Sequence, residues 1–123
     1  MKKKQKIRWM KLPEEHDYPA SKSYLELIFD NKVAIELVEK LKESPITHFK
    51  AKDIFRASKL SLLGISNGHV KKNLDKIRKG KKMSPLLLIR NTKDNTLIIA
   101  DGYHRLCATY YFLEDENVPC KIV

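Results

Sequence analysis

The segment Asp101–Arg105 places a carboxylate, a glycine, a phenol, an imidazole and a guanidinium in consecutive positions. It follows the apolar, β-branched run 96–100 and precedes an apolar, helix-like segment, 106–113. The first N–H groups of a helix lack intrahelical partners and carry the positive end of the helix dipole, so a strand–glycine–helix junction attracts phosphate. Arginine adds a planar pair of donors that matches phosphate oxygens. The segment therefore predicts an anion site with a nucleotide or phosphoester as ligand.

Each residue of this segment has a predicted role and an alternative. Arg105 binds phosphate, or else pairs with a nearby acid. His104 binds phosphate or acts as a general base, or else is a structural histidine in the turn. Asp101 accepts a proton from a substrate hydroxyl or holds Mg²⁺, or else caps the following helix. Gly102 allows the backbone to approach phosphate closely, and Tyr103 stacks on a base or, as we favour, packs over the turn.

Hydrophobic periodicity predicts two helices and a strand in the first half of the chain. An irregular arm reaches to about residue 19, where Pro19 begins a short helix, and Asn31 caps a second helix. The stretch 46–54 is expected to form a strand, followed over 55–65 by a loop with a helical turn.

A third helix begins at Ser66 or Asn67 and ends at Gly80, because its apolar residues recur at i, i+4 and i+7 between these signals. Its start is a second candidate anion site that includes Ser66 and His69, with plain capping as the alternative. Lys72, on the same helix, is expected to screen phosphates, or else to belong to a solvated face.

The last third of the chain reads as a hairpin, a helix and a strand. Turn residues separate the strands 86–90 and 96–101, and the unbroken apolar run at the start of the first strand predicts burial on both faces. A helix over about 103–113 and a strand over 118–123 complete the pattern. The 123 residues thus predict one α+β domain with a small mixed sheet and flanking helices. An arm and helices occupy 1–45 and the core occupies 46–123.

This order of elements and motifs resembles the ParB N-terminal/sulfiredoxin-like superfamily over roughly residues 52–123. The sulfiredoxin signature Gly-Cys-His-Arg is matched by Gly102, His104 and Arg105. Free-serine kinases of the superfamily carry an Asp-Gly-His-His-Arg form, which is closer to Asp101–Arg105. The Gly-Glu-Arg-Arg box of ParB proteins is a poorer match.

The resemblance implies a pocket for the phosphates of ATP, ADP or CTP. It also implies an arginine at the end of the first strand as a second phosphate contact, and Arg56 is its best match. A phosphotransferase or nucleotide hydrolase acting on a small hydroxyl substrate is the reaction class expected. Tyr103 replaces the sulfiredoxin cysteine, so sulfinic acid reduction is not expected. The chain ends without the helix-turn-helix domain of ParB, so a stand-alone partition protein is not expected either.

The formal charge of +10 favours a second function class, a nucleic-acid-binding module. The lysines and arginines of the chain are concentrated in two segments, the N-terminal arm, which includes Lys2, Lys3 and Lys4, and residues 71–82. A non-catalytic protein-interaction module is a third class that no residue pattern tests.

The N-terminal acids Glu14, Glu15 and Asp17, with His16 among them, are candidates to close over the pocket toward His104. The two cysteines lie in apolar segments without metal-type spacing and are expected in the core. No signal peptide or apolar run of membrane-spanning length is visible. A cytoplasmic protein with reduced thiols is therefore expected.

Overall fold

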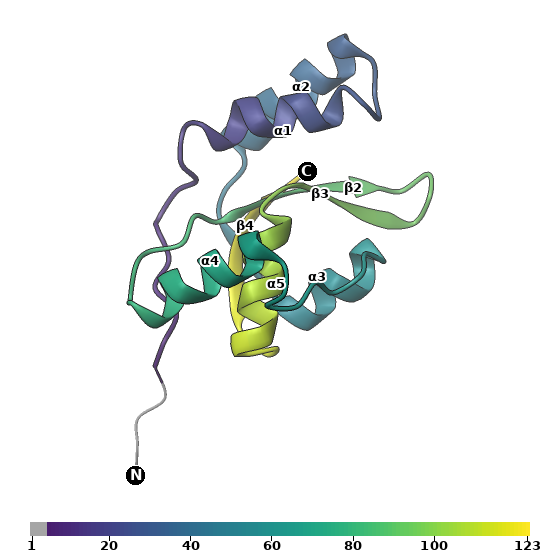
Figure 1. The fold of residues 1–123 in the computed structure, drawn as a ribbon. Helices are drawn as coiled ribbons and strands as arrows, with labels where there is room; N and C mark the ends of the chain where they lie inside the picture. The colour runs from purple at the N-terminus through teal and green to yellow at the C-terminus, as the bar shows by residue number, and fades with distance from the viewer. Residues whose placement is uncertain (1–4) are drawn as a thin grey trace.

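The computed structural model describes residues 5–123, so Lys2, Lys3 and Lys4 of the basic arm lie outside the described residues. Within this range the chain forms an α+β fold in which a mixed sheet separates two groups of helices (Figure 1). The elements are α1 (Asp17–Leu25), α2 (Asn31–Glu43), β1 (Thr47–Lys50), α3 (Ala51–Ser58), α4 (Gly68–Arg78), β2 (Leu86–Asn91), β3 (Thr96–Asp101), α5 (Tyr103–Phe112) and β4 (Asn117–Ile122). None of the helices in the described range is long and apolar enough to cross a membrane.

The sheet has the strand order β1-β4-β2-β3. β2 and β3 form the predicted antiparallel hairpin, β4 runs parallel to β2, and β1 runs antiparallel to β4. The prediction of a mixed sheet is therefore confirmed. Near its C-terminal end β3 pairs Asp101 with Leu87, and the register shifts between Leu87 and Leu88.

Side chains of β2 alternate between two hydrophobic cores, because successive residues of a strand point to opposite faces. Leu86 and Leu88 pack with residues of α3, α4 and α5, whereas Leu87 and Ile89 pack with residues of α1 and α2. These four side chains are almost completely buried. The prediction that this apolar run is covered on both faces is confirmed, and the N-terminal helices are part of the core packing.

Helix caps agree with the sequence at α4 and differ by one residue at α2. The Asn67 side chain accepts hydrogen bonds from the backbone N–H groups of His69 and Val70, as predicted for a capping residue. At α2 the cap is Asp30, whose carboxylate accepts from the backbone N–H of Val33. Asn31, the predicted cap, is the first helical residue instead.

The expected strand over 46–54 is wrong beyond Lys50. β1 ends there, and Ala51–Ser58 forms α3. The residues of α3 that are buried (Ala51, Ile54, Phe55 and Ser58) recur at i, i+3, i+4 and i+7, which is helical spacing. The loop with a helical turn expected over 55–65 is wrong for its first part, since residues 55–58 belong to α3, and the segment from 59 to 67 is irregular with a turn near its end.

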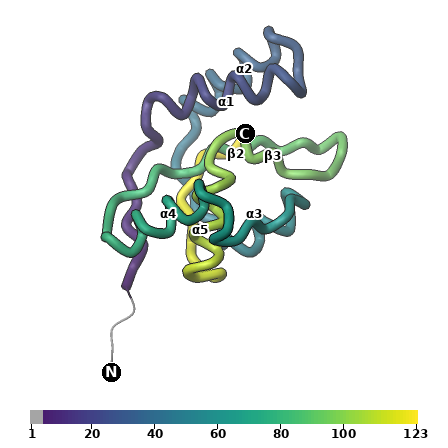
Figure 2. Tube along the Cα trace, viewed as in Figure 1, coloured from purple at the N-terminus to yellow at the C-terminus, as the bar shows by residue number. Residues whose placement is uncertain are grey.

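The N-terminal arm follows the segment between α4 and β2, as the tube in Figure 2 shows. The backbone N–H of Met10 donates to the carbonyl of Met83 (2.8 Å), and the indole N–H of Trp9 donates to the Glu116 carboxylate (3.1 Å). α1 begins at Asp17, two residues before the predicted Pro19. The arm is therefore fastened to the body well before the first helix.

Candidate functional site

The β3–α5 junction depends on Gly102. Its φ of 106° is a left-handed value, and a Cβ there would lie 2.8 Å from Cγ of Leu86 and 3.0 Å from Nη2 of Arg105. Gly102 occupies the N-cap position of α5, and among the described residues no side chain caps this helix. Asp101 thus does not perform the capping role that was its alternative. The first N–H groups of α5 are left without a side-chain acceptor.

The N-terminus of α4 lies beside that of α5. The imidazole rings of His69 and His104 contact each other at 4.9 Å between centroids, with planes inclined by 39°. Burial, and then the positive charge that His69 can carry, lowers the pKa of His104 below its usual range. The lowered pKa favours the neutral form of the His104 ring.

Tyr103 connects this junction to the irregular segment 59–67. Its hydroxyl donates to the backbone carbonyl of Ser61, and its ring lies 5.5 Å from that of His104. Burial, followed by the proximity of Cys107, raises the pKa of the Tyr103 phenol. This contact is the packing role that the sequence favoured over base stacking.

Arg105 has several acceptors within the protein. Its Nε donates to the Ser84 carbonyl (3.0 Å), and its Nη2 donates to the Pro85 carbonyl (3.3 Å) and to Oδ2 of Asp101 (2.9 Å). A second carboxylate, that of Asp17, lies 3.6 Å from Nη2. Pairing with nearby acids, the stated alternative for Arg105, is therefore observed, and direct phosphate binding by this residue stays a prediction.

Asp101 is a mostly buried carboxylate whose partner is Arg105. Burial raises its pKa; the Arg105 charge opposes this rise, and the nearby Asp17 carboxylate adds to it. Because Oδ2 already accepts from the guanidinium, a Mg²⁺ ion would have to compete with Arg105 for this ligand. The surroundings of Asp101 fit a guanidinium better than a divalent cation.

The N-terminal acids reach this network through Asp17. Asp17 is only 3% exposed, and its carboxylate accepts a hydrogen bond from the Ser84 hydroxyl, which itself accepts from the backbone N–H of Glu14 (3.1 Å). His16 Nε2 lies 2.9 Å from the Glu14 carboxylate and 3.4 Å from that of Asp17. The segment contacts Arg105 through Asp17, and its closure over the pocket toward His104 stays a prediction. No sequence pattern indicated that Ser84 belongs to this network.

Arg56 is not at the end of a strand, as the resemblance implied, because the chain has already turned into α3. Its side chain is 82% exposed and lies 3.8 Å from the carboxylate of Asp53, one turn earlier in the helix. It lines a cavity beside Thr96, at the start of β3, whereas Asp101 ends that strand. The lining of that cavity includes no residue of the Asp101–Arg105 segment.

Ser66 and Lys72 lie on the α4 side of the junction, Ser66 just before the Asn67 cap and Lys72 on the helix. Both side chains are exposed. The residues that the structure brings together at the two helix ends are thus Gly102, Tyr103, His104 and His69, with Ser66 and Lys72 on the adjoining helix and its approach. The sequence analysis placed His69 at the start of α4, and its contact with His104 is visible only in the structure.

No protein-family model matches the chain, and no curated protein or solved structure matches it either. The fold class that the coordinates define is an α+β domain with a four-stranded mixed sheet within the described range.

Proposed function

We propose that this chain is a nucleotide-binding domain of ParB/sulfiredoxin type that holds phosphate at the N-terminus of α5. The observation that carries the proposal is the N-terminus without a side-chain cap, beside which His104 contacts His69. Unpaired N–H groups and the positive end of the helix dipole attract an anion there. ATP, ADP and CTP are the ligands to test, and the cytoplasm, where Cys107 and Cys120 stay reduced, is the proposed compartment.

Each residue of the junction has a defined part in this proposal. Gly102 permits the positive φ at which the helix begins, and a side chain there would collide with Leu86. The neutral His104 ring donates its one N–H to the phosphate and keeps its other nitrogen free as an acceptor. Ser66 and Lys72 add a hydroxyl donor and a positive charge from the α4 side. Arg105 stabilises the turn through its hydrogen bonds to the Asp101 carboxylate and to the carbonyl groups of Ser84 and Pro85.

The reaction class we propose is phosphoryl transfer to a small hydroxyl compound, or hydrolysis of the nucleotide. His104 is the proposed general base, since its lowered pKa leaves the ring able to accept a proton near pH 7. Asp101 orients the junction through Arg105 and is the second proposed catalytic group. The proposal assigns no metal ligand at the junction, and Oδ2 of Asp101 accepts a hydrogen bond from Arg105 instead.

Calorimetric titration with ATP, ADP and CTP, each with and without Mg²⁺, tests this function. We expect at least one nucleotide to bind and His104→Ala to weaken that binding about tenfold, the loss expected when one charge-assisted hydrogen bond disappears. His48→Ala is the matched control, because His48 is an exposed histidine on β1. Arg105→Ala is a poor probe, since it also removes the partner of Asp101. Absence of binding by all three nucleotides would refute the proposal.

A second candidate function, binding of a nucleic-acid backbone, is favoured by the exposed face of α4. Val70, Leu74 and Ile77 bury one side of this helix, while the basic residues lie on the exposed side: Lys71, Lys72, Lys76 and Arg78. Such a face binds phosphates with an affinity that falls steeply as salt rises. Gel-shift titrations with DNA and RNA at several salt concentrations test it, and no shift at low salt eliminates it.

A further inference from the structure

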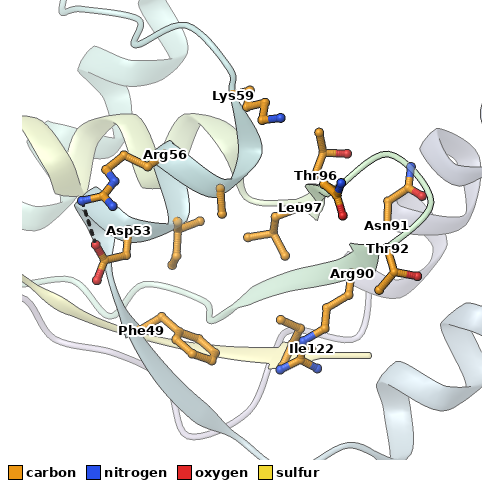
Figure 3. A pocket seen from close by; sticks show the side chains of 13 residues that line it. Phe49, Asp53, Arg56, Lys59, Arg90, Asn91, Thr92, Thr96, Leu97 and Ile122 are labelled. Atoms are coloured by element: carbon orange, nitrogen blue, oxygen red, sulfur yellow. Dashed lines mark ion pairs between the residues drawn. The ribbon is translucent and has the colours of Figure 1, made fainter.

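A cavity of about 730 Å³ lies between α3 and the β2–β3 hairpin. Figure 3 shows side chains from α3, both hairpin strands and the end of β4 around it. The cavity adjoins the first residues of β3, whereas the proposed phosphate site, at the N-termini of α4 and α5, follows the last residue of β3. Its volume is within the range of roughly 300–1,000 Å³ that small-molecule sites occupy.

The floor of the cavity is apolar. Leu97 and Ile122 are partly buried and pack against the core that contains Ile54. Phe49, on β1, and Ala57, on α3, extend this surface toward solvent. A ligand with an aromatic or alicyclic body would therefore remove apolar surface from water, which is the main driving force for binding at such a site.

The rim of the cavity is cationic. Arg56 comes from α3, Lys59 from the end of that helix and Arg90 from β2, and the side chains of all three are exposed. Asp53 is the one acid among the lining residues, and it lies 3.8 Å from Arg56. Three positive charges against one negative charge leave an excess that a ligand can neutralise. The guanidinium group of Arg90 lies beside Ile122 and offers planar, paired donors to an acidic group, whereas that of Arg56 is turned toward Asp53 (Figure 3).

We infer that this cavity binds a small organic anion, with its apolar body on Leu97 and Ile122 and its acidic group facing Arg90. The shared chemistry is one carboxylate or one phosphate on a compact ring system. This site is independent of the nucleotide proposed at the α4–α5 junction. Its Arg56 is the arginine that the resemblance had implied as a phosphate contact elsewhere.

Three naphthalene probes test the inference by NMR titration of the ¹⁵N-labelled protein. 2-Naphthoate and 1-naphthyl phosphate separate the two kinds of acid, and 2-naphthalenemethanol is the uncharged control. We expect the preferred anion to shift the amide signals of Leu97 and Ile122 and to bind roughly tenfold more tightly than the alcohol, since charge-assisted hydrogen bonds contribute about 1.5–3 kcal/mol each. Shifts confined to the His104 region would overturn the inference.

Variants separate the charge of the rim from the shape of the floor. Arg90→Gln should weaken anion binding roughly three- to tenfold, whereas Lys93→Gln, in the hairpin turn and outside the lining, should leave it unchanged. Ala57→Trp should block binding by filling the cavity from an exposed helix position. Equal affinity for the alcohol and the anion, or unchanged anion binding in both Arg90→Gln and Ala57→Trp, would refute the assignment. Circular dichroism confirms that each variant is folded.

Discussion

His69 and His104 bring the N-termini of two separate helices into contact, with their ring centroids 4.9 Å apart. The contact lies beside a helix end that no described side chain caps, while the neighbouring helix is capped by Asn67. An anion placed at this junction would meet one open helix end and two imidazoles. The pair is therefore the most direct place to measure whether the junction responds to phosphate.

The titration of His104 is the first prediction. Its midpoint should lie below the usual 6.5, and His69→Gln should move it upward only in part, because burial is the larger cause of the shift. The unfolded chain then binds the His104 proton more readily than the folded one. The His104 contribution to stability is therefore lost as pH falls from 6.5 through the lowered pKa. NMR of the ring signals measures the midpoint, and a value above 6.5 in the ligand-free protein would contradict the prediction.

Gly102→Ala should destabilise the fold. A positive φ at a non-glycine residue costs about 1–3 kcal/mol, and the new methyl group would also lie 2.8 Å from Leu86 Cγ. Gly68→Ala is the matched control: no atom lies within 4 Å of a Cβ built there, its φ is not positive, and alanine favours the helix. Chemical denaturation gives the two free energies of unfolding. Equal values would show that the junction tolerates a side chain.

Asp17→Ala should cost about 1–3 kcal/mol of stability. It leaves the Ser84 hydroxyl without its acceptor and removes one of the two carboxylates beside Arg105. Because Asp17 belongs to α1, the loss should be accompanied by faster proteolysis of the N-terminal segment. Glu15→Ala, at an exposed neighbouring position, serves as the control. An unchanged unfolding midpoint in Asp17→Ala would show that the contact does not fasten the N-terminal helices.

Leu87→Ala and Leu88→Ala should destabilise the protein to a similar extent. Both side chains are fully buried, but they point into the two different cores of the sheet. Truncation of a buried leucine costs about 2–5 kcal/mol. If the helices α1 and α2 were only loosely attached, Leu87→Ala would cost much less than Leu88→Ala, and urea unfolding would reveal the difference.

The two thiols should be inert in the folded protein. Cys107 and Cys120 are buried, and burial raises the pKa of Cys107 and raises that of Cys120 to about 12. We expect no reaction with a disulfide reagent at pH 8 in native buffer, and reaction of both cysteines in guanidinium chloride. Rapid labelling under native conditions would show that one of them reaches solvent.

Elements with strong local signals were predicted well. Apolar runs bounded by glycine, proline or turn residues predicted the hairpin, α4, α5 and β4. These signals are reliable because they act between residues that are close in the chain. α3 was missed because its helical spacing begins at Ala51, directly after the last residue of β1. With no cap or turn residue between them, strand and helix read as one segment. That error also misplaced Arg56.

The sequence by itself determined the α+β class, the buried hairpin and the strand–Gly102–helix junction. Each of these depends on neighbours in the chain. Only the tertiary structure decided which distant groups meet: Asp17 with Arg105, and His69 with His104. It also placed Arg56 and Arg90 in the lining of one cavity, to which no residue of the Asp101–Arg105 segment contributes. Such pairings depend on how the helices pack over the two faces of the sheet. Packing of distant segments carries no local sequence signature, so it is visible only in three dimensions.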